Sequence, residues 1–155
     1  VEAGDVARPV RRFMPRFDAA AVWSLERIRD GASARAFQLV DARSQDRFLG
    51  EAAEPRPGVK SGRVPGSFNL PFPELIADGR LKDAQDIRDA FARSGIELDR
   101  PIITSCGSGV TAAILTLALE TLGVTGTGLY DGSWAEWGSR TDVPVACGPV
   151  TKDEL

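Results

Sequence analysis

The sequence predicts an α/β fold in which helices flank a parallel β-sheet on both faces. Short apolar segments typical of buried strands alternate with segments of helical periodicity. The 155 residues suit one domain with its own core. Asp41 and Cys106 both stand at the end of a strand-like segment. Since ligands of parallel sheets bind beyond the carboxyl ends of the strands, these two residues mark the edge where we expect the functional site.

The chain opens on an irregular segment followed by a helix. Residues 1–17 are rich in Arg and Pro and show no periodicity, so we expect a linker or N-terminal arm. Asp18 is placed to cap a helix over residues 19–29, where apolar side chains recur at helical spacing. Gly31 is placed to end that helix.

Four short segments are expected to form the sheet. Each is mostly apolar and is bounded by polar, Gly or Pro residues. They are residues 37–41, 67–70, 101–105 and 129–131.

Five further segments are expected to be helical. They are residues 44–50, 72–76, 83–94, 110–122 and 132–137. The third has one apolar face and a C-capping glycine, Gly95. The fourth, which includes Leu117, is apolar enough to be expected in the core. We therefore expect one domain over residues 18–146 and a C-terminal tail over 147–155.

The segment 104–111 reads Thr-Ser-Cys-Gly-Ser-Gly-Val-Thr, and we call residues 106–111 the cysteine loop. Gly107 and Gly109 allow successive backbone N–H groups to turn inward, and the helix that follows directs its positive end at the same point. A thiol there favours the thiolate, so Cys106 is predicted to be a nucleophile and carrier of an anionic adduct. The alternative is a buried structural cysteine.

Composition excludes several kinds of site. The chain contains no histidine and two cysteines, which rules out the usual Cys/His zinc sites and a Cys–His catalytic pair within it. We expect neither a metal nor a cofactor. The formal net charge of −3 gives no basic face for nucleic acid, and no segment is apolar enough for a membrane. Small-molecule or protein partners remain.

Several motifs together resemble the rhodanese sulfurtransferases. They are Val40-Asp-Ala-Arg43, Arg47-Phe48, Gly62-Arg-Val-Pro-Gly66, Cys106-Gly-Ser-Gly-Val-Thr111 and Asp131-Gly-Ser-Trp134. The cysteine loop, Glu54-Pro-Arg56 and the continuation of the last motif to Trp137 resemble more narrowly the C-terminal catalytic half of 3-mercaptopyruvate sulfurtransferases. The resemblance covers residues 18–146 and implies a rhodanese-like fold.

The resemblance also implies a reaction. The Cys106 thiolate would take sulfur from 3-mercaptopyruvate, release pyruvate, and pass the sulfur from a persulfide to a thiol acceptor such as thioredoxin. Ser108 would be the second catalytic residue, relaying a proton. The substrate-binding residues implied are Arg47, Arg56, Gly107, Gly109, Val110 and Thr111. The family supplies the carboxylate partner of Ser108 from a preceding rhodanese-like half, which this chain lacks.

Alternatives to this reading stay open. The residues after the cysteine, Gly107 and Ser108, are neutral, which favours a monoanionic keto acid over the thiosulfate dianion, yet a thiosulfate-using rhodanese or a protein-binding module remains possible. Arg47 and Arg56 could pair with Glu51 and Glu54 instead of substrate. A Cys-x5-Arg phosphatase is disfavoured, because the sixth residue after the cysteine is alanine.

Other residues are assigned to structure rather than chemistry. Asp41 and Arg43 are expected to hold loops at the sheet edge, and Arg63 stands where the family usually has histidine. The tryptophans of the last helix, three positions apart, are expected in the core, and Cys147 is expected to be inert. The C-terminal Lys-Asp-Glu-Leu spells an endoplasmic-reticulum retention signal, but we expect a cytoplasmic protein.

Overall fold

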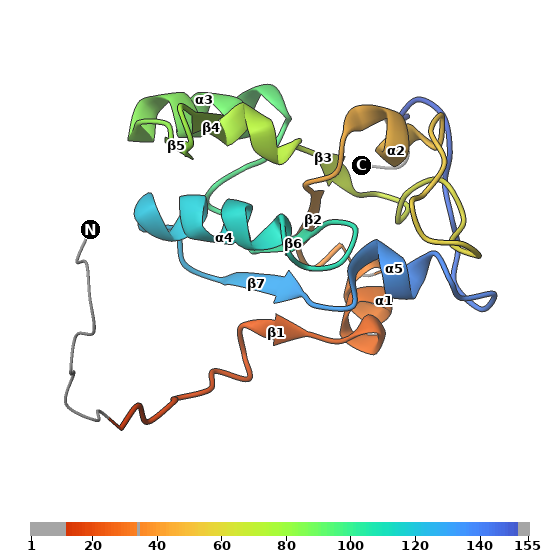
Figure 1. Ribbon diagram of the computed structural model, residues 1–155, viewed down its shortest axis with the longest axis horizontal. Helices are drawn as coiled ribbons and strands as arrows, with labels where there is room; N and C mark the ends of the chain where they lie inside the picture. Colours follow the sequence, from red (N-terminus) through yellow and green to blue (C-terminus); the bar gives the residue numbers. More distant parts are fainter. Residues whose placement is uncertain (1–11, 34, 152–155) are drawn as a thin grey trace, which may run out of the picture.

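Five parallel strands form the central sheet of the computed structural model, which describes residues 12–33 and 35–151 (Figure 1). Their order across the sheet is β1-β7-β6-β2-β3. The bounds are β1 Val22–Trp23, β2 Gln38–Asp41, β3 Phe68–Asn69, β6 Ile102–Ser105 and β7 Thr127–Tyr130. The order places β6, the strand that leads into Cys106, in the middle of the sheet.

The register brings the predicted site to one edge. Asp41 pairs with Ser105 across β2 and β6, and the N–H of Ala42 donates to the Ser105 carbonyl at 2.8 Å. Asn69, at the end of β3, donates from its side chain to the carbonyls of Asp41 and Arg43. The loops after these three strands therefore start side by side, as expected for carboxyl ends of a parallel sheet.

Helices cover both faces of the sheet, as predicted. They are α1 Leu25–Ser33, α2 Gln45–Leu49, the 3-10 helix η1 Phe72–Leu75, α3 Ala84–Arg93, α4 Ala112–Thr121 and α5 Ser133–Trp137. One buried cluster joins η1, α3 and α4 to Val40 and Ile102. The other joins α1 and α5 to Leu39 and Ile103. Since neighbouring strand residues point to opposite faces, each central strand contributes to both clusters.

The predicted helix over 19–29 is wrong at both ends. Residues Val22–Trp23 form β1, which pairs with β7, and the helix begins only at Leu25. Asp18 instead closes a turn, its carboxylate accepting the N–H of Ala20. Gly31 lies within α1 rather than after it, where a β-carbon would clash with the Phe37 ring.

A small antiparallel hairpin was not expected. Strands β4 (Ile76–Ala77) and β5 (Arg80–Leu81) pair around a two-residue turn in which Asp78 and Gly79 both have positive φ. The hairpin follows η1 and lies beside α3, away from the cysteine loop (Figure 1).

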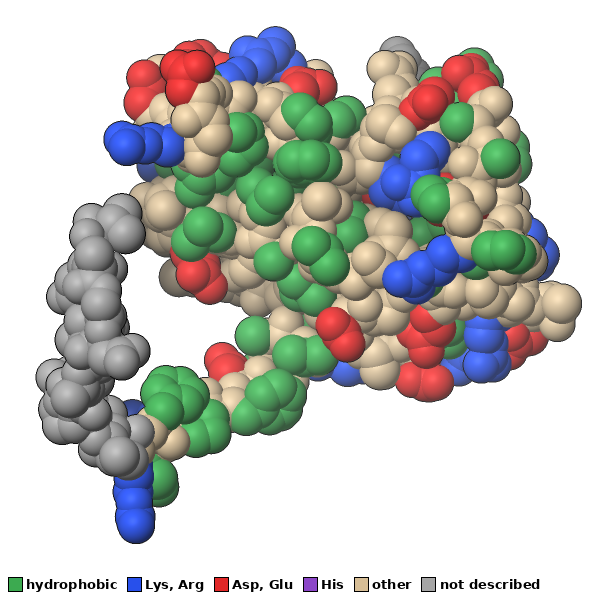
Figure 2. All heavy atoms as spheres, in the orientation of Figure 1, with side chains coloured by type: hydrophobic (Ala, Val, Ile, Leu, Met, Phe, Trp, Pro, Cys, Tyr) green, Lys and Arg blue, Asp and Glu red, His purple; other side chains and the backbone are tan. Residues whose placement is uncertain are grey.

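Helix α4 is only partly in the core. Its face made by Leu115, Ala118 and Leu119 is buried, but Leu117 on the opposite side is 51% exposed, which corrects the expectation that it packs inside. Val110, just before the helix, is 73% exposed. Figure 2 shows exposed apolar side chains over this part of the molecule.

The predicted segments at the two ends of the chain lie largely outside the described residues. Of the expected arm, residues 12–17 are described and exposed, and 1–11 are outside. Residues 152–155, the Lys-Asp-Glu-Leu sequence, are outside as well. Among the helices of the described part, none has the length and apolar character needed to cross a membrane.

Candidate active site

Cys106 lies at the floor of a pocket of about 220 Å³ and is 2% exposed. The walls come from α2, the loop after it, the cysteine loop and α5. Seven of the eight sequence-predicted site residues line it: Arg47, Arg56, Cys106, Gly107, Ser108, Val110 and Thr111. Gly109 belongs to the same loop but does not line the pocket. Glu54, Pro55, Val59 and Ala135 complete the lining.

The backbone of the cysteine loop is turned so that its first carbonyls face away from the pocket. The carbonyls of Cys106 and Gly107 accept the N–H groups of Trp134 and Ala135 at the start of α5, both at 2.9 Å. Among the described residues, the N–H groups of residues 107–111 donate to no other protein group. These amides therefore have no protein acceptor in the described structure.

Gly109 gives the loop its turn. Its φ of +82° is in the left-handed region that favours glycine, and a β-carbon there would lie 3.1 Å from the Asp131 carbonyl oxygen. A β-carbon on Gly107 would lie 3.1 Å from the Nη2 atom of Arg47, so a larger residue there would require the guanidinium to shift. The Arg47 guanidinium thus lies directly over the cysteine loop.

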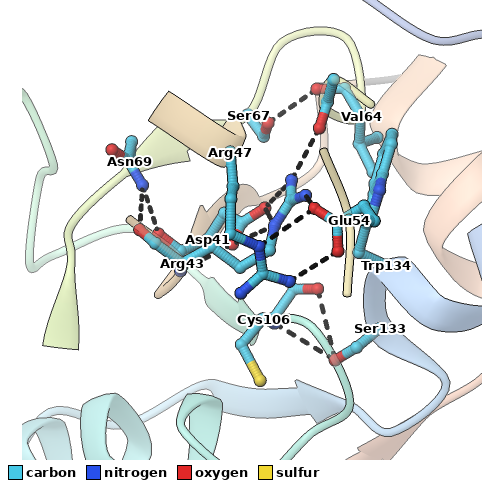
Figure 3. Close-up of polar contacts among 12 residues, drawn as sticks. Asp41, Arg43, Arg47, Glu54, Val64, Ser67, Asn69, Cys106, Ser133 and Trp134 are labelled. Atoms are coloured by element: carbon cyan, nitrogen blue, oxygen red, sulfur yellow. Dashed lines mark hydrogen bonds and ion pairs between the residues drawn. The ribbon is translucent and has the colours of Figure 1, made fainter. Parts of the chain in front are cut away.

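Ser133 anchors the start of the cysteine loop through its side chain. Its hydroxyl accepts the Cys106 N–H at 3.2 Å and donates to the Tyr130 carbonyl at 2.8 Å, as Figure 3 shows for the first of these bonds. The residue is fully buried and has a φ of +50°, unusual for a residue with a side chain. This serine is a site residue that the sequence analysis did not single out.

A buried ion-pair network joins Asp41, Arg43, Glu54 and Arg47 (Figure 3), and two of its members, Glu54 and Arg47, line the opposite side of the pocket. Arg43, whose side chain is 1% exposed, donates to both oxygens of Asp41 and, at 2.8 Å, to Glu54. Its guanidinium also donates to the Gly62 carbonyl and stacks over the Trp134 ring, 4.5 Å from the ring centre. These contacts agree with the expected role of Asp41 and Arg43 in holding loops.

Glu54 links the buried network to the pocket. Its carboxylate, 4% exposed, accepts Arg43 on one side and Arg47 on the other, the latter through Nε at 3.2 Å and Nη2 at 2.5 Å. The hydrogen bond to Glu54 raises the pKa of Arg47, and the charges of Glu54, Asp41 and Cys106 act in the same direction, while burial opposes them. Arg47 is thus held charged and oriented over Cys106.

Arg56 and Ser108 line the exposed part of the pocket. Arg56 makes no ion pair within the described part of the chain, so of the two predicted arginines only Arg47 pairs with Glu54. Neither pairs with Glu51. The Ser108 side chain is exposed and has no carboxylate partner among the described residues. Its predicted proton-relay role stays a prediction.

The remaining sequence assignments fall outside the pocket. Trp134 and Trp137 are each 1% exposed, as predicted for core residues. Arg63 is fully buried and donates to the carbonyls of Gly148 and Pro149. The thiol of Cys147 is exposed and lies against the Ser61 carbonyl. Within residues 12–33 and 35–151, no three His, Cys, Asp or Glu side chains are grouped to bind a metal ion.

Comparison with known proteins gives consistent matches. The family model described as a rhodanese-like domain matches residues 21–140. The chain is 43% identical to the 3-mercaptopyruvate sulfurtransferase of Escherichia coli strain K12 over 94% of its own length. It is 41% identical, over 92% of its length, to thiosulfate/3-mercaptopyruvate sulfurtransferase 1 of Arabidopsis thaliana.

Solved structures agree with the sequence matches. The crystal structure of SseA from Escherichia coli, a 3-mercaptopyruvate sulfotransferase by its description, aligns with a TM-score of 0.71 and 40% identity, over 86% of this chain and 49% of that one. The Tum1 protein of Saccharomyces cerevisiae aligns with a TM-score of 0.76 and 29% identity, over 85% and 48%.

The chain spans about half the length of the curated relatives it matches: 52% of the Escherichia coli enzyme and 38% of the Arabidopsis one. The half matched in the Escherichia coli enzyme is the C-terminal one. Since the family model covers most of the sequence and the pocket is built around the cysteine loop, this chain belongs to the rhodanese family.

Proposed function

We propose that this domain loads sulfur from 3-mercaptopyruvate onto Cys106, the first half-reaction of a 3-mercaptopyruvate sulfurtransferase. The observation that carries the proposal is the placement of Cys106 below Arg47 and beside the unused amides of the cysteine loop. A nucleophile, a bidentate cation for a carboxylate and an anion-binding backbone are together what this transfer requires. The relatives named for the same activity support it.

In the proposed reaction the Cys106 thiolate attacks the thiol sulfur of 3-mercaptopyruvate. A sulfur–sulfur bond forms, the carbon–sulfur bond breaks, and its electron pair leaves on pyruvate enolate. The enolate takes up a proton to give pyruvate, and Ser108 is proposed to relay that proton. The amides of residues 107–111 would stabilise the persulfide left on Cys106.

Arg47 and Arg56 are proposed to bind the keto-acid carboxylate and carbonyl. Arg47 uses Nε and Nη2 for Glu54, so its Nη1 side remains for a ligand. Arg56 is exposed at the pocket mouth and can move to meet it. A planar guanidinium suits a planar keto acid better than an ammonium would.

The second half-reaction needs a thiol acceptor, for which we propose a small thiol or a thioredoxin-like protein. We further propose that a preceding rhodanese-like half completes the cleft, since the relatives are about twice as long. Both cysteines are free thiols, which supports a reducing compartment such as the cytoplasm.

The experiment that tests the proposal is mass spectrometry after mixing the protein with 3-mercaptopyruvate or, separately, with thiosulfate. A gain of one sulfur atom from 3-mercaptopyruvate, mapped by peptide analysis to Cys106 and absent in Cys106→Ser, would support it. Loading from thiosulfate alone would move the assignment to a thiosulfate sulfurtransferase, an activity also named for the Arabidopsis relative. No gain from either donor would favour a binding module and contradict the proposal.

A further inference from the structure

The C-terminal segment of the domain, residues 145–149, lies across the end of the helix that carries Arg47 (Figure 1). We call this segment the C-terminal strap. We infer that Arg63 is a positioning residue of the candidate active site: by binding the strap against α2, it fixes the direction of the Arg47 guanidinium over Cys106. The inference rests on the proposed role of Arg47 in binding the donor carboxylate, and it assigns a function to a residue outside the pocket.

Helix α2 is too short to hold Arg47 in place by itself. It has five residues, Gln45–Leu49, and isolated helices of that length are unstable in water. Its position therefore depends on contacts with the rest of the domain. One such contact is the ion pair of Arg47 with Glu54, and another is the burial of Phe48, which is 1% exposed. The C-terminal strap supplies a third.

The strap binds the last turn of α2. The N–H of Gly148 donates to the Leu49 carbonyl at 2.8 Å, which satisfies one of the carbonyls that a helix leaves open at its C-terminus. Cys147 lies so close that a β-carbon on Gly50, the residue that ends α2, would be 3.0 Å from its sulfur atom. The strap and the end of α2 are thus in direct contact, two residues after Arg47.

Arg63 holds the strap through its side chain and its backbone. The side chain is fully buried, and its guanidinium donates to the carbonyls of Gly148 at 2.6 Å and Pro149 at 3.4 Å. The backbone forms two hydrogen bonds with Ala146, N–H to carbonyl in both directions. The guanidinium also lies 5.3 Å from the centre of the Phe48 ring. Arg63 therefore binds the strap at three of its residues and packs on α2 as well.

The strap also packs on the loop between α2 and β3. A β-carbon on Gly62 would be 2.5 Å from the Ala146 carbonyl oxygen and 2.8 Å from the Cys147 sulfur atom. The Gly62 carbonyl in turn accepts a hydrogen bond from Arg43 of the buried network. Release of the strap would therefore loosen two supports of Arg47, the end of its helix and the network that binds its guanidinium.

The test is the rate at which Cys106 is alkylated by iodoacetate relative to iodoacetamide, read by peptide mapping. The two reagents differ by one carboxylate charge, so their rate ratio reports the cation beside the thiolate and requires no sulfur transfer. Arg63→Leu is expected to lower the ratio roughly fivefold, the effect of one unit charge at hydrogen-bonding range in water. Arg63→Lys keeps the charge and part of the bonding to the strap, and it should restore most of the ratio.

A double substitution shows whether Arg63 acts through Arg47. Arg47→Gln should lower the ratio by itself, and Arg63→Leu added to it should change the ratio no further. Additive effects of the two would overturn the inference, as would an unchanged ratio in a folded Arg63→Leu. Arg80→Leu, on the β4–β5 hairpin, is the matched control, because it removes the same charge away from the cysteine loop. An equal fall of the ratio in Arg80→Leu would also overturn the inference.

Arg63→Leu removes a buried charge with its bonds, so circular dichroism must first show that the variant folds. If it does not, Gly62→Ala carries the test, because the added methyl group meets the strap while Arg63 is retained. Gly58→Ala is its control: Gly58 lies in the same loop and also has a positive φ, but no atom lies within 4 Å of a β-carbon there. A lower ratio in Gly62→Ala alone is expected, and equal ratios in the two variants would overturn the inference.

Failure of this inference is distinguishable from failure of the proposed function. If the parent protein takes up sulfur from 3-mercaptopyruvate but the alkylation ratio does not fall in Arg63→Leu, only the role of Arg63 is wrong. If the ratio falls as expected but no donor loads sulfur onto Cys106, the proposed function is wrong and the positioning of Arg47 by Arg63 stands.

Discussion

The two walls of the pocket are built from charges of different kinds. On the α2 side, full charges sit on side chains that are buried and paired, in the network from Asp41 to Arg47. On the side of the cysteine loop, partial charges sit on backbone amides whose direction is fixed by bonds to α5 and Ser133. Neither wall needs a histidine.

This difference separates stability from reactivity. Removing one member of a buried ion pair leaves the other charge desolvated. Substitutions on the α2 side should therefore mainly lower the free energy of unfolding. Substitutions in the cysteine loop change the direction of its backbone N–H groups and should mainly slow sulfur loading onto Cys106. The four substitutions below test that division, from the largest expected change in free energy to the smallest.

Arg43→Met should destabilise the domain by about 3–5 kcal/mol, because it strands the carboxylates of Asp41 and Glu54 without their shared cation. Urea unfolding followed by circular dichroism measures the effect. Arg43→Lys keeps the charge but loses the forked geometry and should cost less. An unchanged unfolding midpoint in Arg43→Met would show that the network is not a stabilising element of this wall.

Gly109→Ala should cost about 1–3 kcal/mol of folding free energy, because of its left-handed φ. It should also slow sulfur loading onto Cys106, since the added β-carbon meets the Asp131 carbonyl and shifts the loop. Gly123→Ala is the matched control: its φ is +74°, no atom lies within 4 Å of a β-carbon there, and loading should be unaffected. Equal loading rates in the two variants would contradict this account of the loop.

Ser133→Ala should cost about 1–2 kcal/mol, because the Cys106 N–H loses its acceptor in a buried site. The loading rate should fall with it, as measured by stopped reaction and mass. Ser139→Ala serves as the comparison, since Ser139 is exposed just beyond the same helix and bonds only the Ala135 carbonyl. A folded Ser133→Ala that loads sulfur at the parent rate would remove Ser133 from the site.

Arg56→Gln should leave stability within about 0.5 kcal/mol of the parent, because the side chain is exposed and unpaired in the described structure. The KM for 3-mercaptopyruvate should rise about tenfold, equivalent to about 1.4 kcal/mol, with kcat less affected. Steady-state kinetics with a thiol acceptor measures this. Arg80→Gln, on the β4–β5 hairpin, changes the same charge far from Cys106 and should leave KM unchanged.

Sequence patterns predicted the elements whose apolar residues recur over many positions. Helix α3 fits its predicted range, with Asp83 capping the N–H of Asp86. Strand β1 was not predicted, because a strand of two residues is too short to show alternating apolar and polar side chains. Its partner, β7, lies near the other end of the chain. The β4–β5 hairpin carried a readable signal, the Asp78-Gly79 pair typical of a tight turn.

The site was predictable where chemistry depends on residue type and unpredictable where it depends on packing. Cys106, Arg47 and Arg56 were found from their motifs, and the structure brings them to one pocket. The linking position of Glu54 could not be derived, because it depends on Arg43 being buried against Trp134. The contact of Ser133 also depends on packing, because its hydroxyl accepts the N–H of Cys106, which is distant in the sequence. From the sequence alone, Ser133 is indistinguishable from a serine that begins a helix.

The bonds between the cysteine loop and α5 have a consequence for the order of folding. A ribosome makes Cys106 well before it makes Trp134 and Ala135, whose N–H groups donate to the carbonyls of Cys106 and Gly107. Strand β7, which pairs with β6 and β1, leads directly into α5. The backbone of the cysteine loop therefore gains its bonds to α5 only after the segment that carries β7 and α5 has been made and has packed against the sheet.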